Sequence, residues 1–336
     1  MADYLNAEQY GFCAVSSRVR LARNLADYPF FGPQANRLNG EIVEKVYRTL
    51  KPLDTFSVVY MNDLPDLQAG YLREKYFISP LLAENRVNGA LIINKDETFS
   101  CMVNEEDHLR EQCFTEGLNL FKAYEIIAVK DKILSDRMNF ARDKDFGYIT
   151  TCMSNVGTGM RASVMLFLPA LHATGKMNEV IAEMKQKGFT VRGVFGEGSR
   201  GEGYMYQISN EVTFGFTENE ILKTVSYAAC KICDLELDER HKIFDFDPLR
   251  TEDECMRAYG VLANCKLLDY GEFASLWVKL ALGAYYGFYN LKPNLLYRLF
   301  INMRPAIISY HEGVFTSRDR DIHRAKLVSE TLRGAL

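Results

Sequence analysis

The chain has 336 residues, of which 48% are hydrophobic and 25% charged, and its 40 Lys and Arg against 44 Asp and Glu give a net charge of −4. This length and composition predict one large domain with a buried core and one smaller domain. The chain has no basic tail that would bind nucleic acid. Its apolar runs are too short to span a membrane, and it shows no signal peptide or internal repeat. We therefore expect no direct nucleic-acid or membrane partner.

The sequence contains eight cysteines. In a chain of this size without a secretion signal, free thiols in a reducing cytoplasm are expected rather than disulfides. Cys230 and Cys233 form the one Cys-x-x-Cys pair, but no second pair accompanies them, and His241 alone does not complete a zinc site. No metal held by the protein alone is predicted.

The first motif along the chain is Ser16-Ser17-Arg18-Val19-Arg20. Successive side chains of a strand alternate between its two faces, so Arg18 and Arg20 share a face if this segment is extended. Two guanidinium groups on one face suit the oxygens of a phosphate group.

Residues 90–103 are predicted as two strands joined at residues 94–97, and the acids Glu105, Glu106 and Asp107 and the base Arg110 follow them. Apolar residues beyond the acids fall at roughly helical spacing: Leu109, Cys113, Phe114, Leu118 and Phe121. The acids are therefore predicted at a strand-to-helix junction. Two interpretations follow: the acids cap the helix and are solvated, or they join Arg110 in a site for a cation and an anion together.

Two glycine-containing segments follow. Residues 147–163 are predicted as a strand, a glycine turn and a helix start that carries Arg161, and residues 192–199 form a glycine-rich loop that begins at Arg192. Backbone amides exposed at such turns favour anions. A single glycine loop is commonly only a turn, and the chain has no Walker motif, so arginines rather than a phosphate loop are the candidate phosphate ligands.

These segments, in this order and spacing, resemble the catalytic domain of the guanidino (phosphagen) kinases, and most closely the bacterial protein-arginine kinases, from Ser16 to about Ala325. The resemblance implies an α+β fold. Its catalytic domain, residues 1–245, would be an antiparallel sheet flanked by helices, and residues 246–336 would form a smaller helical C-terminal domain. The cofactors implied are ATP and Mg²⁺.

The resemblance also implies roles for individual residues. Glu106 would be the general base, Glu197 the second acid that holds the guanidinium substrate, and Cys152 a reactive cysteine beside that substrate. The nucleotide would be bound by five arginines and the residues that flank them: Ser16, Ser17, Arg18, Val19, Arg20, Tyr76, Arg110, Arg161, Ala162, Ser163, Val164, Met165, Arg192, Gly193, Val194, Phe195, Gly196 and Glu197.

Two positions depart from the family pattern. Arg200 stands where relatives usually carry an acid, so either Glu202 replaces that acid or the acid is dispensable. Tyr76 stands where relatives often carry a histidine that contacts the nucleotide. A tyrosine can still stack on a base or donate a hydrogen bond.

The ends of the chain favour a protein substrate over a small one. Small-molecule phosphagen kinases carry a helical N-terminal domain before the first arginine motif, which here begins at Ser16. The tail is predicted as helices over residues 252–265, 272–289 and 293–302. It also contains Arg320-Asp321-Ile322-His323-Arg324-Ala325, which is either a surface salt-bridge network or, by resemblance, an allosteric pocket for phosphoarginine.

We therefore expect a cytoplasmic protein-arginine kinase that uses ATP and marks proteins for a Clp-type protease or inactivates a stress-response repressor. The expected partners are protein substrates that bear arginine, an activator protein, a Clp-type chaperone–protease and a second copy of the chain in a homodimer. Two alternatives remain open: a kinase of free arginine, and a non-catalytic adaptor that binds phosphoarginine.

Overall fold

The computed structural model describes residues 10–30, 35–84, 86–193 and 202–333. Eight strands form one sheet, namely β1 (Ala14–Arg23), β2 (Phe56–Tyr60), β3 (Ala90–Asn94), β4 (Phe99–Val103), β5 (Leu109–Glu116), β8 (Met160–Phe167), β9 (Phe189–Gly193) and β10 (Met205–Asn210). Their order is β2-β3-β4-β5-β1-β8-β10-β9, and all neighbours are antiparallel. A separate hairpin pairs β6 (Arg142–Asp143) with β7 (Gly147–Tyr148).

Alternation along β1 divides the sheet into an apolar face and a charged face. Val19 and Leu21 are buried on one side, and Arg18 and Arg20 point to the other. Such alternation is typical of an antiparallel sheet with a core on one side only. β1, the strand that carries the two arginines, lies between β5 and β8 in the middle of the sheet.

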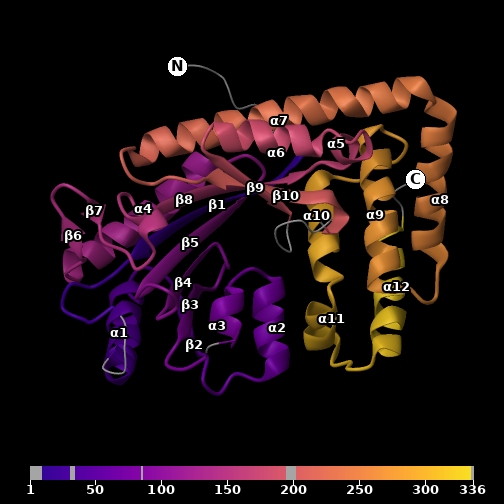
Figure 1. The fold of residues 1–336 in the computed structure, drawn as a ribbon. Helices are drawn as coiled ribbons and strands as arrows, with labels where there is room; N and C mark the ends of the chain where they lie inside the picture. The colour runs from indigo at the N-terminus through magenta and orange to yellow at the C-terminus, as the bar shows by residue number, and fades with distance from the viewer. Residues whose placement is uncertain (1–9, 31–34, 85, 194–201, 334–336) are drawn as a thin grey trace.

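Helices cover the apolar face (Figure 1). They are α1 (Ala35–Leu50), α4 (Leu120–Arg137), α5 (Pro169–Ala173), α6 (Met177–Gln186) and the 29-residue α7 (Glu218–Phe246). A capping box between Thr217 and Glu220 starts α7. Two short helices, α2 (Asp66–Glu74) and α3 (Pro80–Glu84), pack on the other side of β3 and β4 around Leu91 and Met102. Two 3₁₀ turns, η1 (Met153–Asn155) and η2 (Glu202–Tyr204), complete this region.

Five helices form the C-terminal region: α8 (Pro248–Asn264), α9 (Tyr270–Tyr285), α10 (Pro293–Asn302), α11 (Pro305–Glu312) and α12 (Ser317–Leu332). Their core is centred on Trp277, Phe273 and Phe300 and includes Phe167 and Met205 from the sheet. The predicted α+β class, with an antiparallel sheet, flanking helices and a helical tail, is confirmed. The helix expected at residues 293–302 has those bounds.

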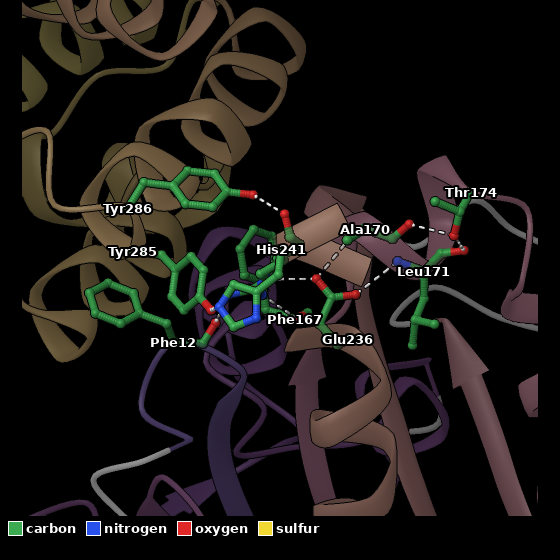
Figure 2. Close-up of polar contacts among 10 residues, drawn as sticks. Phe12, Phe167, Ala170, Leu171, Thr174, Glu236, His241, Tyr285 and Tyr286 are labelled. Atoms are coloured by element: carbon green, nitrogen blue, oxygen red, sulfur yellow. Dashed lines mark hydrogen bonds and ion pairs between the residues drawn. The ribbon is translucent and has the colours of Figure 1, made fainter. Parts of the chain in front are cut away.

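A buried ion pair on α7 joins the sheet to the C-terminal helices. Arg240 donates to Glu236 (Nε–Oε1 2.7 Å) and to the carbonyls of Phe12 and Phe167 at 3.0 and 3.1 Å. Glu236 in turn accepts hydrogen bonds from the first amides of α5, those of Ala170 and Leu171 (Figure 2). Burial raises the pKa of Glu236, and Arg240 and these amides oppose that rise. Removing one partner would leave a buried charge, so the pair fixes the position of α7.

Two local predictions were wrong. Residues 109–116, expected to be helical, form β5, because Leu109, Glu111 and Cys113 alternate with Arg110, Gln112 and Phe114 across the sheet. The helix start expected near Arg161 is the strand β8, in which Ala162, Val164 and Leu166 are buried on the apolar face.

No helix among the described residues is long and apolar enough to cross a membrane.

Candidate active site

Strand register brings five arginines to one face of the sheet. Residues paired across antiparallel strands point to the same side. Arg20 pairs with Arg161 on β8, and Ala22, two residues further along β1, pairs with Arg110 on β5. Arg18 pairs with Ser163, and the register continues through β10 to Arg192 on β9. Four strands thus supply one cationic face, which we call the arginine face: Arg18, Arg20, Arg110, Arg161 and Arg192.

The arginine face concentrates positive charge. Burial lowers the pKa of Arg18 to about 10, and repulsion from Arg110 and Arg161 adds to the shift. The pKa of Arg20 is also lowered, by burial and then by repulsion from Arg18, Arg110 and Arg161, while Glu105 opposes the shift. The Arg20 Nε is buried and has no hydrogen-bond partner among the described residues. A multiply charged anion such as a polyphosphate fits this arrangement.

Neighbouring polar side chains hold some of these arginines in position. Arg18 donates to Gln207 at 2.7 Å, and Arg161 donates twice to the Ser209 Oγ at 3.2 and 3.0 Å. Gln207 and Ser209 alternate on β10, on the arginine face. The sequence analysis missed both residues, and only the strand register could have identified them. Groups fixed in advance lose little entropy when a ligand binds.

The three acids lie in the turn between β4 and β5, not at a helix N-terminus. Asn104, with φ of +58°, starts the turn, and its amide donates to the carbonyl of His108 at 2.9 Å. β5 then continues as a strand, so the predicted contact with a helix dipole is wrong. The acids instead lie at the end of β5 beside Arg110.

Each acid has a different environment. Burial works to raise the pKa of Glu105, but an ion pair with Arg110 (2.7 and 2.8 Å) and a hydrogen bond from Ser79 outweigh it, and the pKa is lowered. Burial and the neighbouring Asp107 raise the pKa of Glu106. No described residue donates a hydrogen bond to the Glu106 carboxylate, so it is the acid available to a ligand.

Asp107 connects the acidic turn to the segment that contains Cys152. Its Oδ1 accepts hydrogen bonds from Asn24 Nδ2 and from the amide of Thr151, both at 2.7 Å. Cys152 follows directly, half-buried, with its Sγ 3.0 Å from the Ser154 Oγ. The hydrogen bond between Thr151 and Asp107 therefore brings the segment of Cys152 next to that of Glu106, 46 positions earlier in the sequence.

The other residues predicted to bind the nucleotide lie on both faces of the sheet. Ser16, Ser163 and Met165 share the arginine face by register. Ser17, Val19, Ala162 and Val164 are buried on the apolar face, where the Ser17 hydroxyl bonds the carbonyl of Gly117 and the amide of Asn119. Gly193 ends β9. Four predicted residues, Val194, Phe195, Gly196 and Glu197, and the variant position Arg200 lie outside the described residues.

Tyr76 links the arginine face to the C-terminal region. Its backbone has a φ of +61°, and its carbonyl accepts a hydrogen bond from Gln112, which pairs with Arg20 across β5 and β1. Its hydroxyl accepts a 2.6 Å hydrogen bond from Arg304, whose guanidinium also lies 4.8 Å from the centre of the Tyr76 ring. Nothing in the sequence around Arg304 indicated this contact.

The C-terminal motif lies on α12. Arg324 is buried and donates to the carbonyls of Met303 and Leu268 at 2.9 and 2.7 Å and to Asp321 at 2.8 Å, which confirms the predicted pair with Asp321. Arg320 bonds the Phe315 carbonyl and the Ser317 hydroxyl. Of the other motif residues, His323 pairs with Glu312, Ile322 is exposed and Ala325 is buried.

The part of the chain that the structure describes contains no group of three or more His, Cys, Asp or Glu side chains that could hold a metal ion.

Comparisons with known proteins agree with this geometry. The family model described as the ATP:guanido phosphotransferase C-terminal catalytic domain matches residues 39–239, and that of the protein-arginine kinase McsB C-terminal domain matches residues 248–335. A protein-arginine kinase of Geobacillus stearothermophilus is 37% identical over 326 residues, which cover 95% of this chain and 90% of the relative. One of Clostridium kluyveri is 38% identical over 334 residues, which cover 96% and 95%.

Solved structures show the same fold. Substrate-free duplicated taurocyamine kinase from Schistosoma mansoni is similar with a TM-score of 0.59 and 26% identity over 70% of this chain, which spans 36% of that protein. Lombricine kinase has a TM-score of 0.60 at 21% identity, over 68% of this chain and 67% of the other, and supports the fold alone. The chain thus belongs to the protein-arginine kinases, a branch of the ATP:guanido phosphotransferase family.

Proposed function

We propose that this kinase transfers the γ-phosphoryl group of ATP to arginine side chains of proteins with Glu106 as the general base. The observation that carries the proposal is the pairing of an unbonded Glu106 carboxylate, whose pKa is raised, with the arginine face. A guanidinium group is protonated at neutral pH and is a poor nucleophile until a proton is removed. A carboxylate beside the phosphate site can accept that proton.

The other residues position the reactants. The arginine face binds the phosphate oxygens and stabilises the charge that develops on them during transfer. Glu105 is not the base, because Arg110 and Ser79 already bind its carboxylate; it fixes Arg110 instead. Glu197 would hold the second side of the substrate guanidinium, with Cys152 beside it. Bound Mg²⁺, held mainly by ATP, would neutralise part of the phosphate charge.

The wider role follows the family resemblance. Phosphorylated proteins would be passed to a Clp-type protease, or a stress-response repressor would be inactivated, in the cytoplasm. An activator protein and homodimerisation through the C-terminal helices belong to the same proposal, as does a division of the chain into domains at 1–245 and 246–336. The segment from Arg320 to Ala325 would bind phosphoarginine allosterically, with Arg320 as its more accessible arginine.

Mass spectrometry tests the proposal under neutral or mildly basic conditions, which preserve the acid-labile N–P bond. The protein, ATP and Mg²⁺ are incubated with casein, and Glu106→Gln and Glu105→Gln are compared with the wild type. Phosphoarginine is expected with the wild type and is reduced at least a hundredfold in Glu106→Gln. Glu105→Gln should mainly raise the KM for ATP, because it releases Arg110 without removing the base.

The alternatives predict other results. A kinase of small substrates would phosphorylate free arginine and leave casein unmodified. An adaptor would bind phosphoarginine and turn over neither substrate, and Glu106→Gln would change nothing.

A further inference from the structure

Large apolar side chains are exposed together near Cys152. Phe146 in the β6–β7 hairpin is 55% exposed, Met153 in η1 is 88% exposed and Phe214 is 50% exposed. The rings of Phe146 and Phe214 lie 6.0 Å apart, and the Ser154 carbonyl, next to Met153, accepts a 3.0 Å hydrogen bond from Thr213, next to Phe214. We call the surface of Phe146, Met153 and Phe214 the apolar rim. Single exposed apolar residues are ordinary, but grouped ones commonly mark an interaction site.

The three segments that carry the apolar rim are fixed to one another. The amide of Tyr148 in the hairpin donates to the carbonyl of Gly157 at 2.8 Å. The Thr213 hydroxyl lies within hydrogen-bond distance of the carbonyls of Ser154 and Val156, at 3.0 and 2.6 Å. A Cβ on Gly157 would lie 2.6 Å from the Thr213 carbonyl oxygen, which shows how closely the backbones approach. The rim is therefore a preformed surface.

The apolar rim continues directly from the proposed substrate site. Met153 is the residue after Cys152, and the amide of Thr151, on the other side of Cys152, bonds Asp107 next to Glu106. A protein substrate cannot place only its arginine in the site; the residues on each side of that arginine must pass over the surface around it. An extended chain advances about 3.3 Å per residue, so residues within a few positions of the arginine reach this surface.

We propose that the apolar rim binds apolar side chains that flank the target arginine in an extended segment of a protein substrate; this rests on the proposed site at Glu106 and Cys152. Extended segments with accessible apolar side chains are a property of unfolded proteins, because folding buries those side chains. The rim therefore favours arginines flanked by apolar side chains over free arginine and over arginines in polar peptides.

The test uses two fluorescent peptides of equal length with one arginine each, flanked by leucine and phenylalanine in one and by glycine and serine in the other. The variant Phe146→Ser/Phe214→Ser is compared with the wild type and with Phe246→Ser. Phe246 is 91% exposed, but it is the last residue of the 29-residue α7, about 40 Å along that helix from its first residue. The β6–β7 hairpin lies on the side of the molecule where α7 begins (Figure 1). Met153→Ser provides a second rim variant at the most exposed position.

Fluorescence anisotropy measures binding, and phosphoarginine formation gives KM and kcat. The wild type should bind the apolar peptide about tenfold more tightly, the double variant should lose that preference with kcat unchanged, and Phe246→Ser should keep it. Met153→Ser should lose part of it. Because binding is measured without turnover, a kept preference with no phosphorylation would overturn the proposed function and leave the rim intact.

Two outcomes overturn the inference. The first is that the wild type binds the two peptides equally, or that the double variant weakens the binding of both peptides to the same extent. The second is a change in oligomeric state, measured by light scattering for Phe146→Ser/Phe214→Ser, with peptide preference retained. That result would make the rim an interface between two copies of the chain.

Discussion

Glu105 and Glu106 are adjacent in the chain, yet their pKa values are displaced in opposite directions. Burial acts to raise both. For Glu105 the ion pair with Arg110 and the Ser79 hydrogen bond reverse the effect, whereas for Glu106 repulsion from Asp107 adds to it. One carboxylate is therefore tied to a cation, and the other has the raised pKa that suits the proposed general base.

The raised pKa of Glu106 predicts a cost in stability. Ionisation is harder in the folded protein than in the unfolded chain, so the folded state loses stability as the pH rises from the unfolded to the folded pKa. Glu106→Gln should raise Tm at pH 7 by about 1–2 °C. The gain should disappear near pH 4, where both chains carry a neutral group. Thermal unfolding between pH 4 and 8 measures this.

The control for this experiment is Glu105→Gln. Its lowered pKa means that the charged form stabilises the fold above the unfolded pKa and that this stability is lost as the pH falls. Glu105→Gln should therefore lower Tm at pH 7. A lower Tm for Glu106→Gln at neutral pH would contradict the account of its environment.

Replacement by methionine should affect the stability of the fold differently at Arg20 and at Arg23. Arg20 is half-buried on β1 and faces other arginines, whereas Arg23 is buried and pairs with Asp131 at 2.8 Å on the apolar face. Arg20→Met should weaken ATP binding at least tenfold, measured by calorimetry, and leave Tm unchanged or higher. Arg23→Met should cost about 3–5 kcal/mol of unfolding free energy, because Asp131 loses its partner. If Arg20→Met destabilised the fold as much, Arg20 would be structural.

At the scale of elements, the sequence predicted β3 and β4 as strands, but it placed a helix start at β8 and helical spacing over β5. The charged face of β5 carries Arg110 and Gln112, and Leu109 and Cys113, four residues apart, share a face in a helix as well as in a strand. The residues of the site were recognisable as motifs. Their grouping was not, because it depends on the register among β1, β5 and β8, to which residues far apart in the chain contribute.

Gly159, at the start of β8, shows why glycine is required there. Its φ is +63°, and a Cβ would lie 2.6 Å from the carbonyl oxygen of Ala22 on β1. Gly159→Ala should therefore lower the unfolding free energy by more than about 2 kcal/mol in urea titrations, because both strain and a backbone clash arise. Gly175→Ala is the control: its φ is +76°, but nothing lies within 4 Å of the added Cβ. Its cost should be about 1 kcal/mol.

At the scale of the whole molecule, Arg304 connects the C-terminal helices to the segment of Tyr76, which contacts the arginine face. It donates to the carbonyl of Glu74 at 2.7 Å and to the Tyr76 hydroxyl at 2.6 Å, and α11 lies beside α2 (Figure 1). Contacts between residues 228 positions apart have no signature in the local sequence. Only the three-dimensional structure shows that Tyr76, the position that departs from the family pattern, has this partner.

A double-mutant cycle tests that connection. Arg304→Met and Tyr76→Phe remove the same hydrogen bond, so their combined effect on the unfolding free energy should be smaller than the sum, by about 0.5–3 kcal/mol. Arg298→Met is the control. Arg298 bonds Glu116 at 2.6 Å between two exposed side chains, so its loss should change stability by less than about 1 kcal/mol. Additive effects of Arg304→Met and Tyr76→Phe would show that the bond is not formed in solution.

The concentrated positive charge of the arginine face has a consequence for the lifetime of the protein. Repulsion among Arg18, Arg20, Arg110 and Arg161 opposes folding, and a bound polyphosphate relieves it. A ligand present at a hundred times its dissociation constant stabilises the folded state by about 2.7 kcal/mol. Bound nucleotide then stabilises the folded protein as well as serving as a substrate. A cell depleted of ATP would lose kinase molecules to unfolding as well as losing their activity.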